Sequence, residues 1–164
     1  MLNIDDLWQT ALNDTHEFND DEIKLLLDNR LWFVTERLNT LSNHSEKEIL
    51  FDLIMLAIDS LSEHRQAILN IAKNFIITPN LLCHSQAQIL REINIWHQNL
   101  GLHWNTGKHL QNVLFFGVLT YAINIWIDDD SIDSAKVMAK IDELISWMME
   151  LKNNPLQIVR QFGF

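Results

Sequence analysis

Helix-breaking residues are scarce in this sequence, which has only two prolines and four glycines among its 164 residues. Because these residues tend to interrupt regular elements, their scarcity predicts long elements joined by few tight turns. Apolar residues recur at intervals of three and four along nearly the whole chain, beginning with Ile4, Leu7, Trp8 and Ala11. No stretch sustains the alternation of period two that indicates a half-buried strand. The pattern predicts an all-α fold.

Capping signals and breakers divide this pattern into about eight or nine helices. Residues 19–22 look like a capping start, and Ser45 with Glu48 has the spacing of a capping box. Pro79 and Gly101 separate later helices. The length suits a single domain over residues 1–164 with one hydrophobic core. The predicted apolar stripes fall at 4–12, 23–27, 31–38, 49–61, 67–76, 82–100, 109–127, 131–151 and 156–162.

The chain is strongly acidic, with a net charge of −10 and a pI of about 5.0. Such a protein is repelled by nucleic acid phosphates and anionic lipid head groups, so we do not expect nucleic acid as a partner. Cys83 is the only cysteine and cannot form an internal disulfide, which favours a reducing compartment. The N-terminal residues lack the basic start of a signal peptide, and the most apolar run, 113–127, is shorter than the ~20 residues that span a bilayer. We therefore expect a cytoplasmic protein.

The segment 109–127 is apolar on nearly every side of the helix it predicts. In a soluble protein such a helix has to be covered on most sides, so it is either central in the fold or half of a subunit interface. The sequence also contains six tryptophans, an unusually large share. These side chains either fill gaps between helices or line an apolar pocket or an interface.

Common patterns for catalysis and metal binding are missing from the sequence. None of the seven histidines lies four residues from another, and no glutamate stands three residues before one. The helical zinc and di-iron patterns are therefore absent. Asp128–Asp133 lacks the glycine and the distal glutamate of a calcium loop, and we interpret it as a helix cap. Cys83 and His84 are adjacent and do not face each other on a helix. We expect no enzymatic activity, no cofactor and no metal site.

Three segments resemble the signatures of one protein family. The segment Leu50–Arg65 resembles the pattern Met-x-Arg-Phe-Asp-x-Leu-x-x-His-Arg. The matching residues are Met55, Asp59, Leu61, His64 and Arg65, whereas Ala57 and Ile58 differ from the pattern. Trp126–Asp133 resembles Trp-Leu-x-Asp-x-Ser-x-Asp, and Val137–Asp142 resembles the Thr-Met-Ala-x-Leu-Asp that follows it. These signatures are similar to those of the ubiquinone biosynthesis protein Coq-nine family and its bacterial relatives. The match covers roughly residues 50–150.

The resemblance implies a tetracycline-repressor-like fold. Residues 1–40 are then a degenerate helix-turn-helix remnant, residues 45–152 the ligand-binding and dimerisation helices, and residues 153–164 an amphipathic tail. The implied function is non-catalytic binding of a lipid or an isoprenoid quinone intermediate for ubiquinone biosynthesis. Implied partners are a hydroxylase of that pathway and a second copy of the chain, with the last two long helices as the interface of a homodimer.

Candidate ligand-binding residues lie in and beside the apolar helix. An isoprenoid tail needs apolar walls and few polar anchors. Family relatives carry basic residues just before the penultimate helix, suited to a lipid head group, and here Lys108 and His109 stand nearby. The candidates are the aromatic residues available to line a cavity, together with this lysine: Trp96, Trp104, Lys108, Phe115, Phe116 and Tyr121.

Two other functions stay open. A tetracycline-repressor-type transcriptional regulator needs a basic head, but residues 1–30 carry eight acidic side chains against Lys24 and Arg30, a net charge of −6. If the chain is such a regulator, its DNA binding is lost or altered. A protein-docking module would instead use the C-terminal tail, which is compatible with docking on a partner, on a membrane interface or on its own core. The apolar tail residues are Leu156, Ile158, Val159, Phe162 and Phe164.

Overall fold

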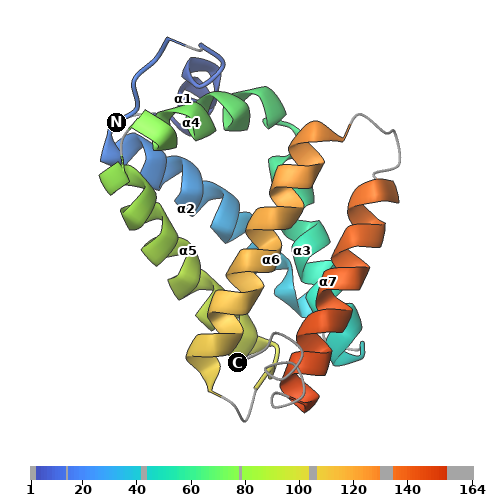
Figure 1. Ribbon diagram of the computed structural model, residues 1–164. Coiled ribbons are helices and arrows are strands. Elements are labelled where there is room, and N and C mark those ends of the chain that lie inside the picture. The colour runs from blue at the N-terminus through green and yellow to red at the C-terminus, as the bar shows by residue number, and fades with distance from the viewer. Residues whose placement is uncertain are drawn as a thin grey trace.

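The computed structural model describes residues 3–13, 15–41, 44–77, 79–103, 107–129 and 135–154, with the backbone alone for 73–77 and 79–84. Every regular element in these ranges is a helix (Figure 1). The elements are α1 (Ile4–Thr10), α2 (Asp20–Arg37), the short 3-10 helix η1 (Leu38–Leu41), α3 (Glu46–Ser62), α4 (Arg65–Ile77), α5 (Pro79–Asn99), α6 (Lys108–Asp128) and α7 (Ala135–Asn153). The all-α prediction is confirmed.

The predicted number of eight or nine helices is too high, because the described residues form seven α-helices. The sequence pattern assigns the stripes at 23–27 and 31–38 to two helices, whereas the structure has the single helix α2. The polar stretch between the stripes contains no glycine or proline that would end a helix. In it, Asn29 accepts hydrogen bonds from the side chains of Trp8 and Arg30. The helix predicted at 156–162 lies outside the described residues, and the tetracycline-repressor-like arrangement stays a prediction.

Several helix ends follow their sequence signals. The capping boxes predicted at Asn19–Glu22 and Ser45–Glu48 both form, at the starts of α2 and α3. Gly101 follows the end of α5 with a φ of 68°, in the left-handed region that glycine adopts at little cost. The backbone N–H of Leu102 then donates to the carbonyl of His97 at 2.8 Å, which closes the helix end.

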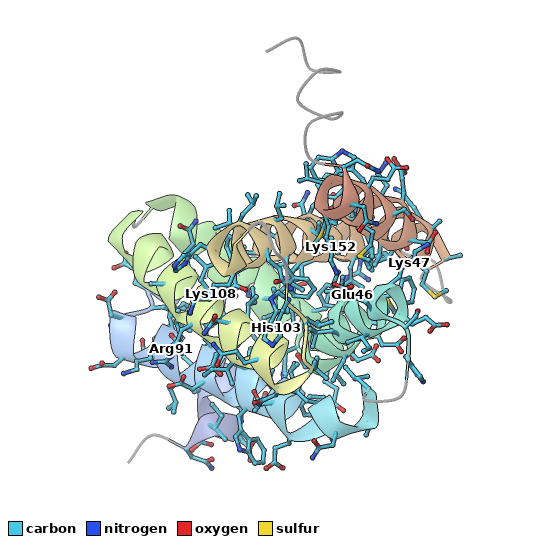
Figure 2. All side chains as sticks on the ribbon, turned by 90° about the horizontal axis from the view of Figure 1, so that it is seen from below. Glu46, Lys47, Arg91, His103, Lys108 and Lys152 are labelled. Carbon is cyan, nitrogen blue, oxygen red and sulfur yellow. The ribbon has the colours of Figure 1, made fainter. Side chains whose placement is uncertain are left out.

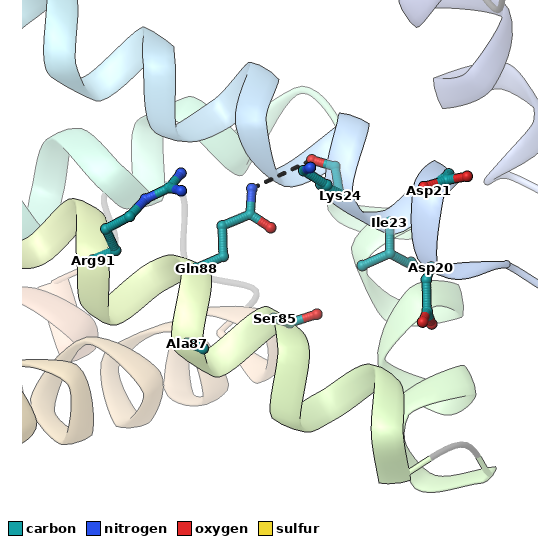
Figure 3. Close-up of a pocket in the computed structure, with 8 residues that line it drawn as sticks. All are labelled: Asp20, Asp21, Ile23, Lys24, Ser85, Ala87, Gln88 and Arg91. Atoms are coloured by element: carbon teal, nitrogen blue, oxygen red, sulfur yellow. Dashed lines mark hydrogen bonds between the residues drawn. The ribbon is translucent and has the colours of Figure 1, made fainter.

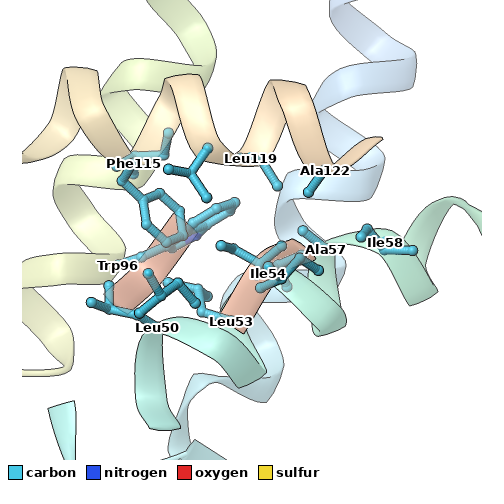
Figure 4. Close-up of a cluster of buried hydrophobic side chains, with 14 of the residues drawn as sticks. Leu50, Leu53, Ile54, Ala57, Ile58, Trp96, Phe115, Leu119 and Ala122 are labelled. Atoms are coloured by element: carbon cyan, nitrogen blue, oxygen red, sulfur yellow. The ribbon is translucent and has the colours of Figure 1, made fainter. Parts of the chain in front are cut away.

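The hydrophobic core has two parts, and α2 contributes to both. The larger part packs α3, α5, α6 and α7 against the second half of α2. Figure 4 shows its centre, where Trp96 of α5 and Phe115 of α6 face Leu50 and Leu53 of α3. The indole Nε1 of Trp96 donates to Oγ1 of Thr35 at 2.8 Å, so its polar atom is satisfied. The smaller part joins α1, the first half of α2 and α4 through Leu7, Trp8, Ala11, Phe18, Ile23, Leu26, Ala67 and Ile71.

Helix α6 is buried along one side only. Its inner face packs against α3, α5 and α7. On the outer face, Leu110, Val113 and Tyr121 are 45%, 55% and 46% exposed, and Gly117 is exposed between them. By length and composition α6 could also cross a membrane, but the core helix of a soluble protein passes the same test. Within one copy of the chain, the outer face of α6 is an apolar surface without charged residues over 110–127.

Candidate ligand-binding cavity

A cavity of about 290 Å³ lies where α2, α4, α5 and α6 come together. Figure 1 shows these helices around that region, on the opposite side of α6 from α7. Voids much larger than a water molecule are rare in a close-packed interior, so a cavity of this size marks a candidate site. Most of its described walls are apolar: Trp8, Ile23, Leu26, Leu27, Leu61, Ile68, Ile71, Ala72, Ile89, Phe116, Ile123 and Ile127.

The cavity has a buried floor and an exposed rim. On the floor, Trp8 and Leu26 are only 4% and 2% exposed. On the rim, Thr120 and Asn124 of α6 are exposed, so the cavity opens beside the outer face of that helix. The polar residues among the described walls include no carboxylate and are Arg30, Ser85, Gln86, Thr120 and Asn124.

Arg30 is the one charged residue among the described walls of the cavity. Its Nε donates to Oδ1 of Asn29 at 2.8 Å, and its Nη2 donates to the same oxygen. Its Nη1 donates to the backbone carbonyl of Ser60 at 3.0 Å. The guanidinium carbon lies 5.2 Å from the centroid of the Trp8 ring, within the range of a cation–π contact. The guanidinium is thus held in place by neutral groups.

His64 stacks on the cavity residue Trp8, with ring centroids 4.1 Å apart and an interplanar angle of 9°. Burial lowers the pKa of His64, and the charge of Arg30 lowers it further, against the opposing effects of Glu63 and Asp5. Burial also lowers the pKa of Arg30, although an arginine stays protonated at neutral pH. Near pH 7 the positive charge beside Trp8 therefore resides on Arg30 and not on the histidine.

A second and more polar cavity of about 480 Å³ adjoins the first, since Ile23 and Ser85 line both. Figure 3 shows its remaining walls, which come from the start of α2 and from α5: Asp20, Asp21, Lys24, Ala87, Gln88 and Arg91. The Nε2 of Gln88 bridges the two helices by donating to the backbone carbonyl of Lys24 at 3.5 Å. Charges of both signs line this groove, so it selects neither an anionic nor an apolar ligand.

Of the predicted aromatic residues that the structure describes, only Phe116 lines the apolar cavity. Trp96 and Phe115 are 1% and 0% exposed and belong to the larger core cluster (Figure 4). Tyr121 is 46% exposed on the outer face of α6. The prediction for Trp104 falls outside the described residues.

Lys108, the predicted head-group residue, is exposed at the first position of α6. Figure 2, which views the molecule from below relative to Figure 1, labels Lys108 and His103. The α6 residues that line the cavity begin at Phe116, which is about 12 Å further along the helix at ~1.5 Å per residue. Lys108 and the cavity are therefore at different ends of α6.

Sequence reasoning missed the residues of α1, α2 and α4, which are eight of the seventeen described residues that line the cavity. Their apolar stripes are visible in the sequence, as at Leu26, Ile68 and Ile71, but a stripe does not say whether the facing helices fill the space between them. The one local signal for the cavity is Arg30, because this charged residue stands directly before Leu31, which packs into the core.

A buried polar cluster lies outside the cavity, between α5 and α6. Nδ1 of His97 donates to Oδ1 of Asn112 at 2.8 Å, and Nδ2 of Asn112 donates to Oδ1 of Asn94 at 3.2 Å. Burial lowers the pKa of His97, and this effect outweighs the raising effect of the hydrogen bond that His97 donates to Asn112. Among the described residues, no group of three or more histidine, cysteine, aspartate or glutamate side chains could hold a metal ion.

Two of the segments on which the family resemblance rests contact each other in the structure. Arg65, at the end of the first segment, donates to the backbone carbonyls of Ile127 and Asp129 in the second. Its guanidinium carbon also lies 5.7 Å from the centroid of the Trp126 ring. No family model, no curated protein and no solved structure matches the chain. The resemblance to the Coq-nine family therefore stays a prediction that rests on these motifs.

Proposed function

We propose that this protein is a non-catalytic lipid-binding protein and that the cavity between α2, α4, α5 and α6 receives the apolar part of its ligand. The observation that carries this proposal is the cavity itself, whose described walls are apolar apart from a few polar groups. Apolar walls with few polar anchors are typical of small-molecule sites. Filling such a space with hydrocarbon removes apolar wall surface from water, at roughly 25 cal/mol per Å².

The size of the cavity limits how much of a lipid it encloses. Its volume of about 290 Å³ lies at the lower end of the ~300–1,000 Å³ that ligand pockets usually have. A short acyl chain, or the first units of an isoprenoid chain, fits this space. A longer tail would leave through the open rim at Thr120 and Asn124.

The resemblance to the Coq-nine family suggests which lipid this is. We propose an isoprenoid or quinone intermediate of ubiquinone biosynthesis, presented to a hydroxylase of that pathway. A protein with this task works in the cytoplasm and contacts membrane surfaces peripherally. The exposed apolar residues beside the open rim are compatible with such contact, because they would meet either a bilayer surface or a partner protein.

We also propose a homodimer that covers the outer face of α6 together with α7. The supporting observation is the uncharged surface of Leu110, Val113, Gly117 and Tyr121 on a protein that otherwise carries a net charge of −10. A two-fold interface brings the same patch of both copies together, and charged residues are depleted at the centres of such interfaces.

The experiment that tests lipid binding is native mass spectrometry of the purified protein, followed by organic extraction and lipid analysis. We expect a co-purifying lipid or quinone precursor in stoichiometric amount. The matched variants are Ala72→Phe, which places a ring in the cavity, and Ala139→Phe, which places one on the exposed surface of α7. Ala72→Phe should release the ligand, and Ala139→Phe should retain it. A ligand-free protein, or equal retention by both variants, would contradict the proposal.

A further inference from the structure

Arg30 has hydrogen-bonding capacity that its described neighbours leave unused. A guanidinium group has five N–H donors, and the bonds to Asn29 and Ser60 use one on each of its three nitrogens. One N–H on Nη1 and one on Nη2 therefore have no described partner. Two N–H groups on the terminal nitrogens are the arrangement with which arginine holds a carboxylate or phosphate group in two parallel bonds.

The charge of Arg30 is also not neutralised within the cavity. Its hydrogen-bond acceptors are an amide oxygen and a backbone carbonyl. The two carboxylates that act on it electrostatically, Asp5 and Glu63, are exposed and do not line the cavity. A charge beside apolar walls interacts more strongly with an opposite charge than it would in water. The cavity thus combines apolar walls with one fixed positive charge that no carboxylate among its described walls neutralises.

We propose that Arg30 anchors the anionic head group of an amphiphilic ligand, a carboxylate or a phosphate, whose hydrocarbon chain occupies the apolar cavity. This inference rests on the proposed lipid-binding function and assigns the ligand's chemical class. The overall charge of −10 repels anions at long range, so the selection for a negative head group depends on this local site. Asn29 and Trp8 act as positioning residues, because both hold the guanidinium without contributing charge.

The test compares three probes of the same chain length by isothermal titration calorimetry: dodecanoate, dodecyl phosphate and the neutral dodecanol. The wild-type protein should bind at least one of the two anions about tenfold or more tightly than the alcohol, as expected for hydrogen bonds to a charged group. The ratio of the two anion affinities identifies the preferred head group. Arg30→Met should bind all three probes with the affinity of the alcohol.

Two further variants separate a loss of anchoring from a loss of folding. Arg30→Lys keeps the charge but loses the paired N–H groups, so it should retain part of the preference for anions. Arg37→Met removes an arginine of the same helix that is exposed and does not line the cavity, and it should bind like the wild type. Circular dichroism confirms that each variant is helical.

The outcomes distinguish the two proposals. If the wild type binds anions and alcohol equally, or if Arg30→Met keeps the preference for anions, the anchor is wrong while apolar binding in the cavity stands. If none of the three probes binds, both the anchor and the proposed lipid-binding function are contradicted.

Discussion

The Arg65 guanidinium on α4 donates a hydrogen bond to the backbone carbonyl of Asp129, 3.2 Å away and just beyond the end of α6. The same Nη2 donates to the carbonyl of Ile127. The last carbonyls of a helix have no hydrogen-bond donors within the helix, and they lie at the negative end of the helix dipole. A cationic donor placed there supplies the missing hydrogen bonds and interacts favourably with the dipole. This contact ties α4, one wall of the cavity, to the end of α6, another wall.

We predict that Arg65→Met lowers the free energy of unfolding by about 2 kcal/mol, because it removes charge-assisted bonds from partly buried carbonyls. Urea denaturation measures this change. Arg91→Met is the matched control, since Arg91 is exposed and forms its ion pair with the adjacent residue Glu92. That substitution should change stability by less than about 0.5 kcal/mol. Equal effects of the two substitutions would mean that Arg65 does not cap α6.

Stability should also depend on the protonation of His97. Because burial lowers the pKa of this residue in the folded state, the unfolded chain takes up a proton at a higher pH than the folded one. The contribution of neutral His97 to the free energy of unfolding is complete above the pKa of ~6.5 that histidine has in the unfolded chain. It is lost as the pH falls below that pKa. We predict that the free energy of unfolding falls as the pH is lowered from ~7.5 to ~5.5, measured by urea denaturation at each pH.

His97→Gln is the variant that isolates this contribution, since glutamine keeps an amide donor for Asn112 but does not titrate in this range. The variant should lose less stability than the wild type over the same pH interval. Because His64 also has a lowered pKa, the free energy of unfolding of the variant should still depend on pH, with a smaller slope. Parallel pH profiles of the two proteins would show that His97 does not cause the dependence.

A third prediction concerns the capping box at the start of α3. The Oγ of Ser45 accepts from the backbone N–H of Glu48 at 3.4 Å, and the side chain and backbone of Ser45 together lower the pKa of Glu48. Ser45→Ala should therefore reduce the free energy of unfolding by about 1 kcal/mol and raise the pKa of Glu48, followed by NMR titration. Ser62→Ala removes an exposed hydroxyl at the other end of α3 and should alter neither quantity.

The sequence predicted best what depends on neighbouring residues along the chain. The capping boxes at Asn19 and Ser45 and the end of α5 at Gly101 all follow from short patterns whose partners lie within a few residues. The prediction of two helices where the structure has the single helix α2 was wrong for a related reason. The polar stretch around Asn29 looks like a boundary locally, but its side chain bonds to Trp8 of another helix, which only the folded chain reveals.

The cavity was beyond prediction because it depends on how helices pack. From the sequence, the neighbouring candidates Phe115 and Phe116 were equally plausible as cavity wall or core. The structure separates them, because Phe115 is fully buried in the larger core cluster and Phe116 lines the cavity. Adjacent positions on a helix point about 100° apart, so the rotation of α6 about its axis decides which of the two faces the cavity. Arg30 lies far from the apolar helix in sequence, and only the packing of α2 brings it to the same space.

The outer face of α6 supplies the last prediction. If two copies meet through this face, Val113→Glu would place a charge in an apolar interface and should convert the dimer to a monomer. Leu25→Glu is the control, since Leu25 is an apolar residue of α2, 37% exposed and outside this face. Sedimentation velocity over a range of concentrations measures both. Because the wild type is proposed to be dimeric, a monomeric wild type, or dissociation of both variants alike, would exclude the α6 face as the interface.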